Sequence, residues 1–162
     1  MGLQEKFDRN NAWEGRPIGA IGLKEGIDAE RAILGVATGE SSDEFMPFTE
    51  AIDDTKERQP LPFGRSKLIK NLREKIAGKC NNKGIPVKFF TAVGTPLDIH
   101  HGVDAFFEHG RERVTLDLTL REKNSSKADI ILYASLDGDG EVHIEPYEME
   151  RVAIAAAAIL ND

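Results

Sequence analysis

The stretch HGVDAFFEHGRERVTLDLT, residues 101–119, consists of two apolar runs joined by a polar turn. Each run contains one aspartate, Asp104 in the first and Asp117 in the second. Strands normally disfavour aspartate, and successive side chains along a strand point to opposite faces. The pattern therefore predicts a β-hairpin in which one acid interrupts each apolar arm.

The register of this hairpin decides where the two acids lie. Counting back from a turn at residues 109–112 puts Phe106 opposite Thr115 and Asp104 opposite Asp117. Directly opposed residues have Cβ atoms about 4.5–5.5 Å apart, and like charges there are destabilising. The other face of the two arms is wholly apolar and is expected to be core; it comprises Val103, Ala105, Phe107, Val114, Leu116, Leu118 and Leu120.

Something must offset the repulsion between Asp104 and Asp117. A divalent cation such as Mg²⁺, which prefers oxygen ligands, would do so, and so would a proton shared by the pair. A slipped register is the third alternative, with each aspartate hydrogen-bonded by threonine or by backbone N–H groups. All three remain open from the sequence.

The rest of the chain alternates helical and extended patterns. Helices are predicted over about 28–38, near 48–57, from Ser66 to about Lys79, and over 149–160; strands are predicted over 85–93, 127–135 and 141–147. The fold class is therefore α+β, with a mixed, mainly antiparallel sheet of about five strands flanked by helices. We expect a single domain, in which residues 1–64 form a helix and an irregular extension that pack on a core at 65–162.

Composition excludes several classes of protein. The chain has 162 residues, of which 40% are hydrophobic and 30% charged, as in ordinary globular proteins. No apolar run approaches the roughly 20 residues of a membrane helix, and no apolar signal core opens the chain, so we expect a cytoplasmic protein without a membrane partner. The single cysteine, Cys80, is interpreted as an incidental surface thiol.

Charge is unevenly spread along the sequence. Residues 65–88 hold eight Lys or Arg and one acid, Glu74, although the whole chain has a net charge of −7. The overall balance argues against a non-specific coat on nucleic acid. The basic segment is either one nucleic-acid-binding face or a solvated helix surface. A homo-oligomer also remains open.

The order of a helix, a strand and a hairpin with an acid on each arm resembles the PD-(D/E)XK nuclease superfamily. Asp104 within GVDAFF and Asp117 within VTLDLT match its two acids, and the resemblance covers about residues 65–135. It implies a restriction-endonuclease-like fold in which Asp104 and Asp117 bind Mg²⁺ or Mn²⁺. It also implies a glutamate on the preceding helix, for which Glu74 is the first candidate and Glu30 the second.

The sequence departs from this superfamily at the lysine that positions or activates the attacking water. That lysine stands two residues after the second acid, where this chain has Thr119. Lys127 is the first candidate to supply the missing charge, followed by Lys123 and Lys88. The connection at 121–126 is also too short for the helix that usually follows the second acid.

The resemblance implies Mg²⁺-dependent hydrolysis of phosphodiester bonds in nucleic acid, with Asp104, Asp117, Lys127, Thr119 and Glu74 as site residues. A non-catalytic structural or interaction module with the same fold is an alternative.

A small transition-metal hydrolase using His100 and His101 is another alternative. On a strand, Asp98 and His100 would share a face with Asp104, and histidine with carboxylate suits Zn²⁺, Mn²⁺ or Fe²⁺. A pair of loop histidines that caps or packs would give the same pattern.

Overall fold

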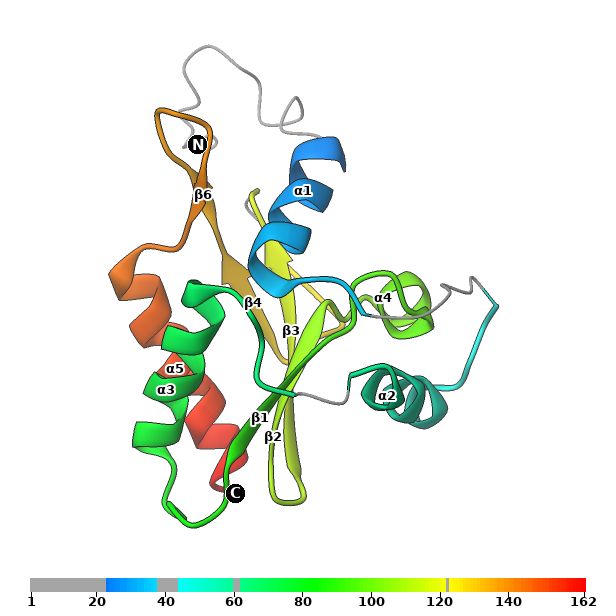
Figure 1. Cartoon of the computed structure of the whole chain (residues 1–162), viewed down its shortest axis with the longest axis vertical. Coiled ribbons are helices and arrows are strands. Elements are labelled where there is room, and N and C mark those ends of the chain that lie inside the picture. The colour runs from blue at the N-terminus through cyan, green and yellow to red at the C-terminus, as the bar shows by residue number, and fades with distance from the viewer. Residues whose placement is uncertain (1–22, 38–43, 60–61, 122) are drawn as a thin grey trace.

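The computed structural model describes residues 23–37, 44–59, 62–121 and 123–162 (Figure 1). Within them the chain forms five helices and six strands: α1 (Leu23–Leu34), α2 (Phe48–Glu57), α3 (Lys67–Lys79), β1 (Val87–Thr91), α4 (Pro96–His101), β2 (Ala105–His109), β3 (Glu112–Thr119), β4 (Ile130–Tyr133), β5 (Ser135–Leu136), β6 (Val142–His143) and α5 (Pro146–Leu160). The α+β class is confirmed. None of the helices in the described part of the chain is long and apolar enough to cross a membrane.

The central sheet has four strands in the order β1-β2-β3-β4. The first two pairings are antiparallel, and β3 pairs with β4 in parallel, so the sheet is mixed and mainly antiparallel. The expected fifth strand does not join it: β6 pairs only with β5, in a separate two-stranded ribbon. The run predicted at 127–135 is likewise shorter, because the chain leaves the sheet after Tyr133.

The predicted hairpin is present. Its turn lies at Gly110 and Arg111, with Gly110 at φ 64°, a left-handed conformation that glycine adopts without strain. The register pairs Phe106 with Thr115, as the sequence predicted.

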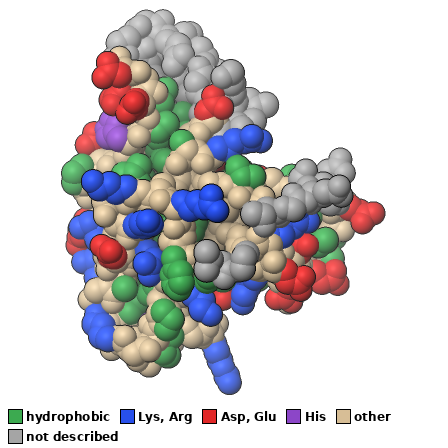
Figure 2. All heavy atoms as spheres, in the orientation of Figure 1, with side chains coloured by type: hydrophobic (Ala, Val, Ile, Leu, Met, Phe, Trp, Pro, Cys, Tyr) green, Lys and Arg blue, Asp and Glu red, His purple; other side chains and the backbone are tan. Residues whose placement is uncertain are grey.

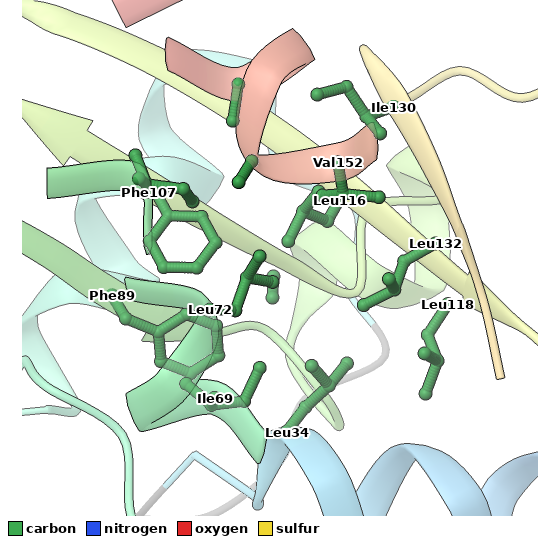
Figure 3. Packing of buried hydrophobic residues seen from close by; sticks show 14 of the residues in the cluster. Leu34, Ile69, Leu72, Phe89, Phe107, Leu116, Leu118, Ile130, Leu132 and Val152 are labelled. Atoms are coloured by element: carbon green, nitrogen blue, oxygen red, sulfur yellow. The ribbon is translucent and has the colours of Figure 1, made fainter. Parts of the chain in front are cut away.

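The main core lies between the sheet and the helix pair α3 and α5 (Figures 1 and 3). The Ser66 hydroxyl caps α3 by accepting the N–H of Ile69 at 3.1 Å. Ile69, Leu72 and Ile76 follow at helical spacing and are buried against the sheet.

Two segments outside the predicted core strands also contribute to this cluster. From α1 come Ala29, Ile33 and Leu34, so the N-terminal helix shares the core of α3. Cys80, which follows α3, is 2% exposed. The expectation of a surface thiol is wrong, because the residue ends the buried stripe of α3, and burial raises the pKa of this thiol.

The opposite face of the hairpin is covered by α2 and α4. A second apolar cluster there contains Ile52 and Leu97 around Phe90 and Phe106, whose rings stack with centroids 5.0 Å apart. Val103, expected in the main core, belongs to this second cluster. The face that carries the two aspartates is therefore covered around Phe106 by apolar side chains of α2 and α4.

Candidate metal centre

The segment before Asp104 is a short helix, and not the extended chain that the histidine hypothesis required. Pro96 opens α4, and Gly102 ends it at φ 67° in the left-handed region. Asp98 lies in the first turn, where its Oδ2 accepts the N–H of Gly94 at 3.1 Å. The helix therefore holds Asp98 in place and turns the chain sharply into Asp104.

Asp104 lies where the β2–β3 ladder stops. Its N–H donates to the carbonyl of Leu116 at 2.9 Å, and its Oδ2 accepts the N–H of Leu118 at 2.8 Å. The last ladder pair is Ala105 with Leu116. The N–H of Leu118 therefore bonds to the side chain of Asp104 and not to a backbone carbonyl of β2. The regular pairing stops at Ala105 with Leu116, one residue before the predicted pair of Asp104 with Asp117. Hydrogen bonding to a backbone N–H is part of what the slipped-register alternative foresaw.

Three carboxylates meet at this point. Glu30 from α1, Asp98 from α4 and Asp104 each offer an oxygen, and these oxygens lie within 4.8 Å of one another. A cation bound at about 2.0–2.6 Å from carboxylate oxygens fits between them. In Figure 1, α1 and α4 lie beside the sheet at the same end of β3. These residues could hold a metal ion.

Asp117 is buried beside this triad but has partners of its own. Its Oδ2 accepts hydrogen bonds from the Lys123 ammonium at 2.5 Å and from the Ser126 hydroxyl at 2.7 Å. An ion pair therefore offsets the charge of Asp117, whereas Asp104 has the N–H of Leu118. The two acids named from the sequence are close, but the cluster suited to a cation joins Asp104 to Glu30 and Asp98.

All four acids except Asp98 line one open cavity of about 670 Å³. The segment that follows β3 forms much of its wall, and there Thr119 accepts the N–H of Arg121 at 3.1 Å. The lining residues are Gly26, Glu30, Ile99, His100, Gly102, Asp104, Asp117, Leu118, Thr119, Leu120, Arg121, Lys123, Ser125, Ser126 and Lys127.

The electrostatics of the cluster favour a proton or a cation over free negative charge. Burial, together with the charge of Glu30, raises the pKa of Asp104 to about 9, although the hydrogen bond from Leu118 acts in the opposite direction. Burial also raises the pKa of Glu30 to about 7, with further contributions from Asp98 and Asp117. A metal ion would displace these protons.

The three lysine candidates differ in their position relative to the cavity. Lys127, the first choice, lines the cavity and is exposed there, and its stem lies close to Gly102. Lys123 also lines the cavity but is bound to Asp117. Lys88 lies on β1, two strands away from β3, and is not among the lining residues.

Glu74 does not join the site. It is exposed on α3 and lines a separate hollow with Leu68 and Met149. The choice of Glu74 for the helix glutamate is corrected, because the stripe that includes Leu72 faces the core and turns position 74 away from the sheet. The second choice, Glu30, reaches the acids from α1 instead.

The two histidines differ in their surroundings. The Nε2 atom of His101 lies 2.7 Å from the carbonyl oxygen of Met46, and its ring contacts those of Phe45 and Phe48. This is the packing role that was the alternative to metal binding. His100 lines the cavity. The three-residue acid cluster found in the described part of the chain contains neither histidine.

The basic segment is partly used within the fold. Lys75 and Lys79 pair with Glu150 of α5, and Arg73 donates to the carbonyl of Val87. Other cations of this segment are exposed, namely Arg65, Lys67, Lys70, Lys83 and Lys88. Figure 2 shows Lys and Arg side chains spread over the side of the molecule where α3 lies, and Asp and Glu gathered around α2.

The sequence placed Asp98 beside Asp104 only on the assumption of a strand shared with His100, and it ranked Glu30 second; the structure brings Asp98 to Asp104 from a helix instead. A local signal for this helix is Thr95-Pro96, which is typical of a helix start and places Asp98 in the first turn. No family model matches this chain, and neither does any curated protein or solved structure.

Proposed function

We propose that this chain is a metal-dependent phosphodiesterase that acts on nucleic acid, with Mg²⁺ or Mn²⁺ held by Glu30, Asp98 and Asp104. The observation that carries the proposal is the convergence of these three carboxylates, from three separate elements, beside an open cavity. Carboxylate oxygens with no nitrogen or sulfur ligand suit a hard cation. Because the cluster contains no histidine, it disfavours the alternative hydrolase that would bind its metal through His100 and His101.

The proposal includes membership of the PD-(D/E)XK superfamily and its restriction-endonuclease-like fold. Three features support it: a mixed sheet with two antiparallel pairings and one parallel pairing, an acid where β2 begins, and an acid on β3. A glutamate from a preceding helix also reaches these acids, but it is Glu30 on α1. The connection from β3 to β4 has no helix among its described residues, as the sequence led us to expect.

The side chains divide the work of hydrolysis as follows. A divalent cation, when bound, supplies a water of lowered pKa and offsets charge on the phosphate. Glu30, Asp98 and Asp104 fix where that cation lies. Lys127, exposed in the cavity wall, provides positive charge toward the phosphate that Thr119 cannot provide.

Asp117 has a positioning role in this scheme. Through Lys123 and Ser126 it ties the segment after β3 to the sheet. The Ser126 hydroxyl in turn accepts the N–H of Ala128 at 3.0 Å, next to Lys127. Asp117 therefore holds the wall on which Lys127 stands. Exposed cations of the basic segment, such as Lys67 and Lys70, would contact backbone phosphates without reading sequence.

Cleavage of labelled DNA and RNA oligonucleotides in Mg²⁺, in Mn²⁺ and in EDTA tests the proposal. We expect metal-dependent cleavage that falls at least a hundredfold in Asp104→Asn and in Glu30→Gln. Asp53→Asn, which removes an exposed acid on α2 outside the cavity, is the matched control and should cleave like wild type. Equal cleavage by wild type and Asp104→Asn would refute the assigned site.

The absence of cleavage by the wild-type protein, combined with stabilisation by Mg²⁺, would instead indicate the non-catalytic alternative. In that case the acids would hold a structural ion. Thermal melting with and without the ion separates these outcomes, because a ligand that binds only the folded state raises the melting temperature.

A further inference from the structure

Four aromatic rings gather beside the cavity, and we call them the aromatic patch: Phe45, Phe48, His100 and His101. The ring of Phe45 lies 5.6 Å from those of His100 and His101, and the ring of Phe48 lies 5.6 Å from that of His101. Phe45 is 64% exposed and Phe48 is 41% exposed. Two phenylalanines therefore present ring faces or edges to solvent at one place on the surface.

The aromatic patch is continuous with the proposed metal site through α4. His100, one of the four rings, lines the same cavity as Glu30 and Asp104, two of the three carboxylates. Ile99, next to His100 on α4, also lines the cavity and is 49% exposed. A group bound at the acids and a group lying on Phe45 would therefore belong to neighbouring parts of one ligand.

The charges around the cavity indicate what that ligand is. The segment after β3 contributes Arg121, Lys123 and Lys127 to the wall, while α4 contributes the aromatic side. Cations beside aromatic rings match a nucleotide, which has a phosphate next to a flat base. Stacking of bases on aromatic side chains, together with cations along the backbone, is how proteins bind single strands without sequence preference.

A duplex cannot use such a patch, since its bases are stacked and paired inside the helix. Single strands, loops and frayed ends present an open base face. We propose that the aromatic patch stacks an unpaired nucleobase, so that the substrate of the proposed phosphodiesterase is single-stranded nucleic acid or a single-stranded end. The inference rests on the proposed function for the phosphate side of the site.

Binding without cleavage tests the patch apart from catalysis. The probes are 12-nucleotide DNA and RNA strands with one 2-aminopurine, each alone and annealed to its complement, with Ca²⁺ in place of Mg²⁺. We expect the full chain to bind the single strands at least tenfold more tightly than the duplexes and to quench 2-aminopurine fluorescence. Phe45→Ala should weaken single-strand binding about tenfold, because base–aromatic stacking contributes about 1–3 kcal/mol per base.

Two further variants separate stacking from general damage. Phe45→Trp retains an aromatic ring and should restore binding and quenching. Phe63→Ala removes another exposed phenylalanine, 39% exposed, whose ring lies under Arg73 away from the cavity, and it should bind like wild type. Quenching by DNA, by RNA or by both supports the inference and identifies the nucleic acid.

Equal affinity for single strands and duplexes would overturn the inference, and so would unchanged binding by Phe45→Ala. These results are independent of the proposed function, which fails separately if wild-type protein cleaves no oligonucleotide in Mg²⁺ or Mn²⁺. Selective, Phe45-dependent binding without any cleavage would leave a single-strand-binding module.

Discussion

Replacing Asp104 with asparagine should stabilise the metal-free protein, and the gain should grow with pH. Asp104 is only 5% exposed, and burial with the nearby charge of Glu30 raises its pKa to about 9. In an unfolded chain an aspartate has a pKa of about 3.9. Asparagine has nearly the same shape, still accepts the N–H of Leu118 through its side-chain oxygen, and has no proton to lose.

The pH dependence of the stability follows from the number of protons that the folded and unfolded states bind. Below about pH 4 both states are protonated, and the group contributes no pH dependence. Between about pH 4 and the folded pKa of about 9, the native state keeps a proton that the unfolded state has lost, so stability falls by about 1.4 kcal/mol per pH unit. From pH 6 to pH 8, wild type should lose about 2–3 kcal/mol more than Asp104→Asn. Above about pH 9 the difference stops changing.

Urea unfolding in EDTA at pH 6, 7 and 8 measures this difference directly. The difference in the free energy of unfolding between Asp104→Asn and wild type should grow at each higher pH. For Asp53→Asn, a substitution at an exposed site on α2, the difference from wild type should stay constant. In saturating Mg²⁺, wild type should become more stable than Asp104→Asn, because the ion stabilises only the protein that binds it. A gap that stays constant or narrows as pH rises would refute the reasoning.

Three other substitutions test the packing and the charges. Gly64→Ala should cost roughly 2 kcal/mol in urea unfolding, because Gly64 has φ +76° and an added Cβ would lie 2.6 Å from a methyl of Ile69; a neutral result would contradict the packing. Gly78→Ala, in α3 with open space around it, should stabilise by about 0.5–1 kcal/mol in the same assay, and a loss would contradict the helix. Lys123→Gln should raise the pKa of Glu30 above about 7, because the charge of Lys123 lowers that pKa in wild type and Asp117 loses its ion-pair partner in the variant. An NMR titration of the carboxyl groups measures the shift, and a downward shift would contradict the geometry.

The sequence specified the hairpin because its signals are local. Alternation of apolar residues and a turn containing Gly110 are enough to set the register from Phe106 with Thr115 outward. The parallel pairing of β3 with β4 has no such local mark, since it joins Leu116 to Ile130 across a connection without a turn motif. The departure of the chain from the sheet after Tyr133 was missed for the same reason: a continuous apolar run does not show which partner each residue takes.

The site was half predictable. Asp104 and Asp117 stood out because acids are rare inside apolar strands. Glu30 and Asp98 lie on helices, where exposed acids are common, and only the packing of α1 and α4 against the end of the hairpin brings them to Asp104. Glu74 is conspicuous in the sequence as the one acid among the cations of residues 65–88. That pattern does not show toward which side of α3 its side chain points.

Anomalous diffraction from crystals soaked in Mn²⁺ tests the central claim most directly. If Glu30, Asp98 and Asp104 form a metal centre, a single strong anomalous peak should lie between them, about 2.0–2.6 Å from their carboxylate oxygens. The peak should be absent in crystals of Asp104→Asn soaked in the same way. A wild-type map with no peak at this cluster, or with manganese only at other surface acids, would contradict the account.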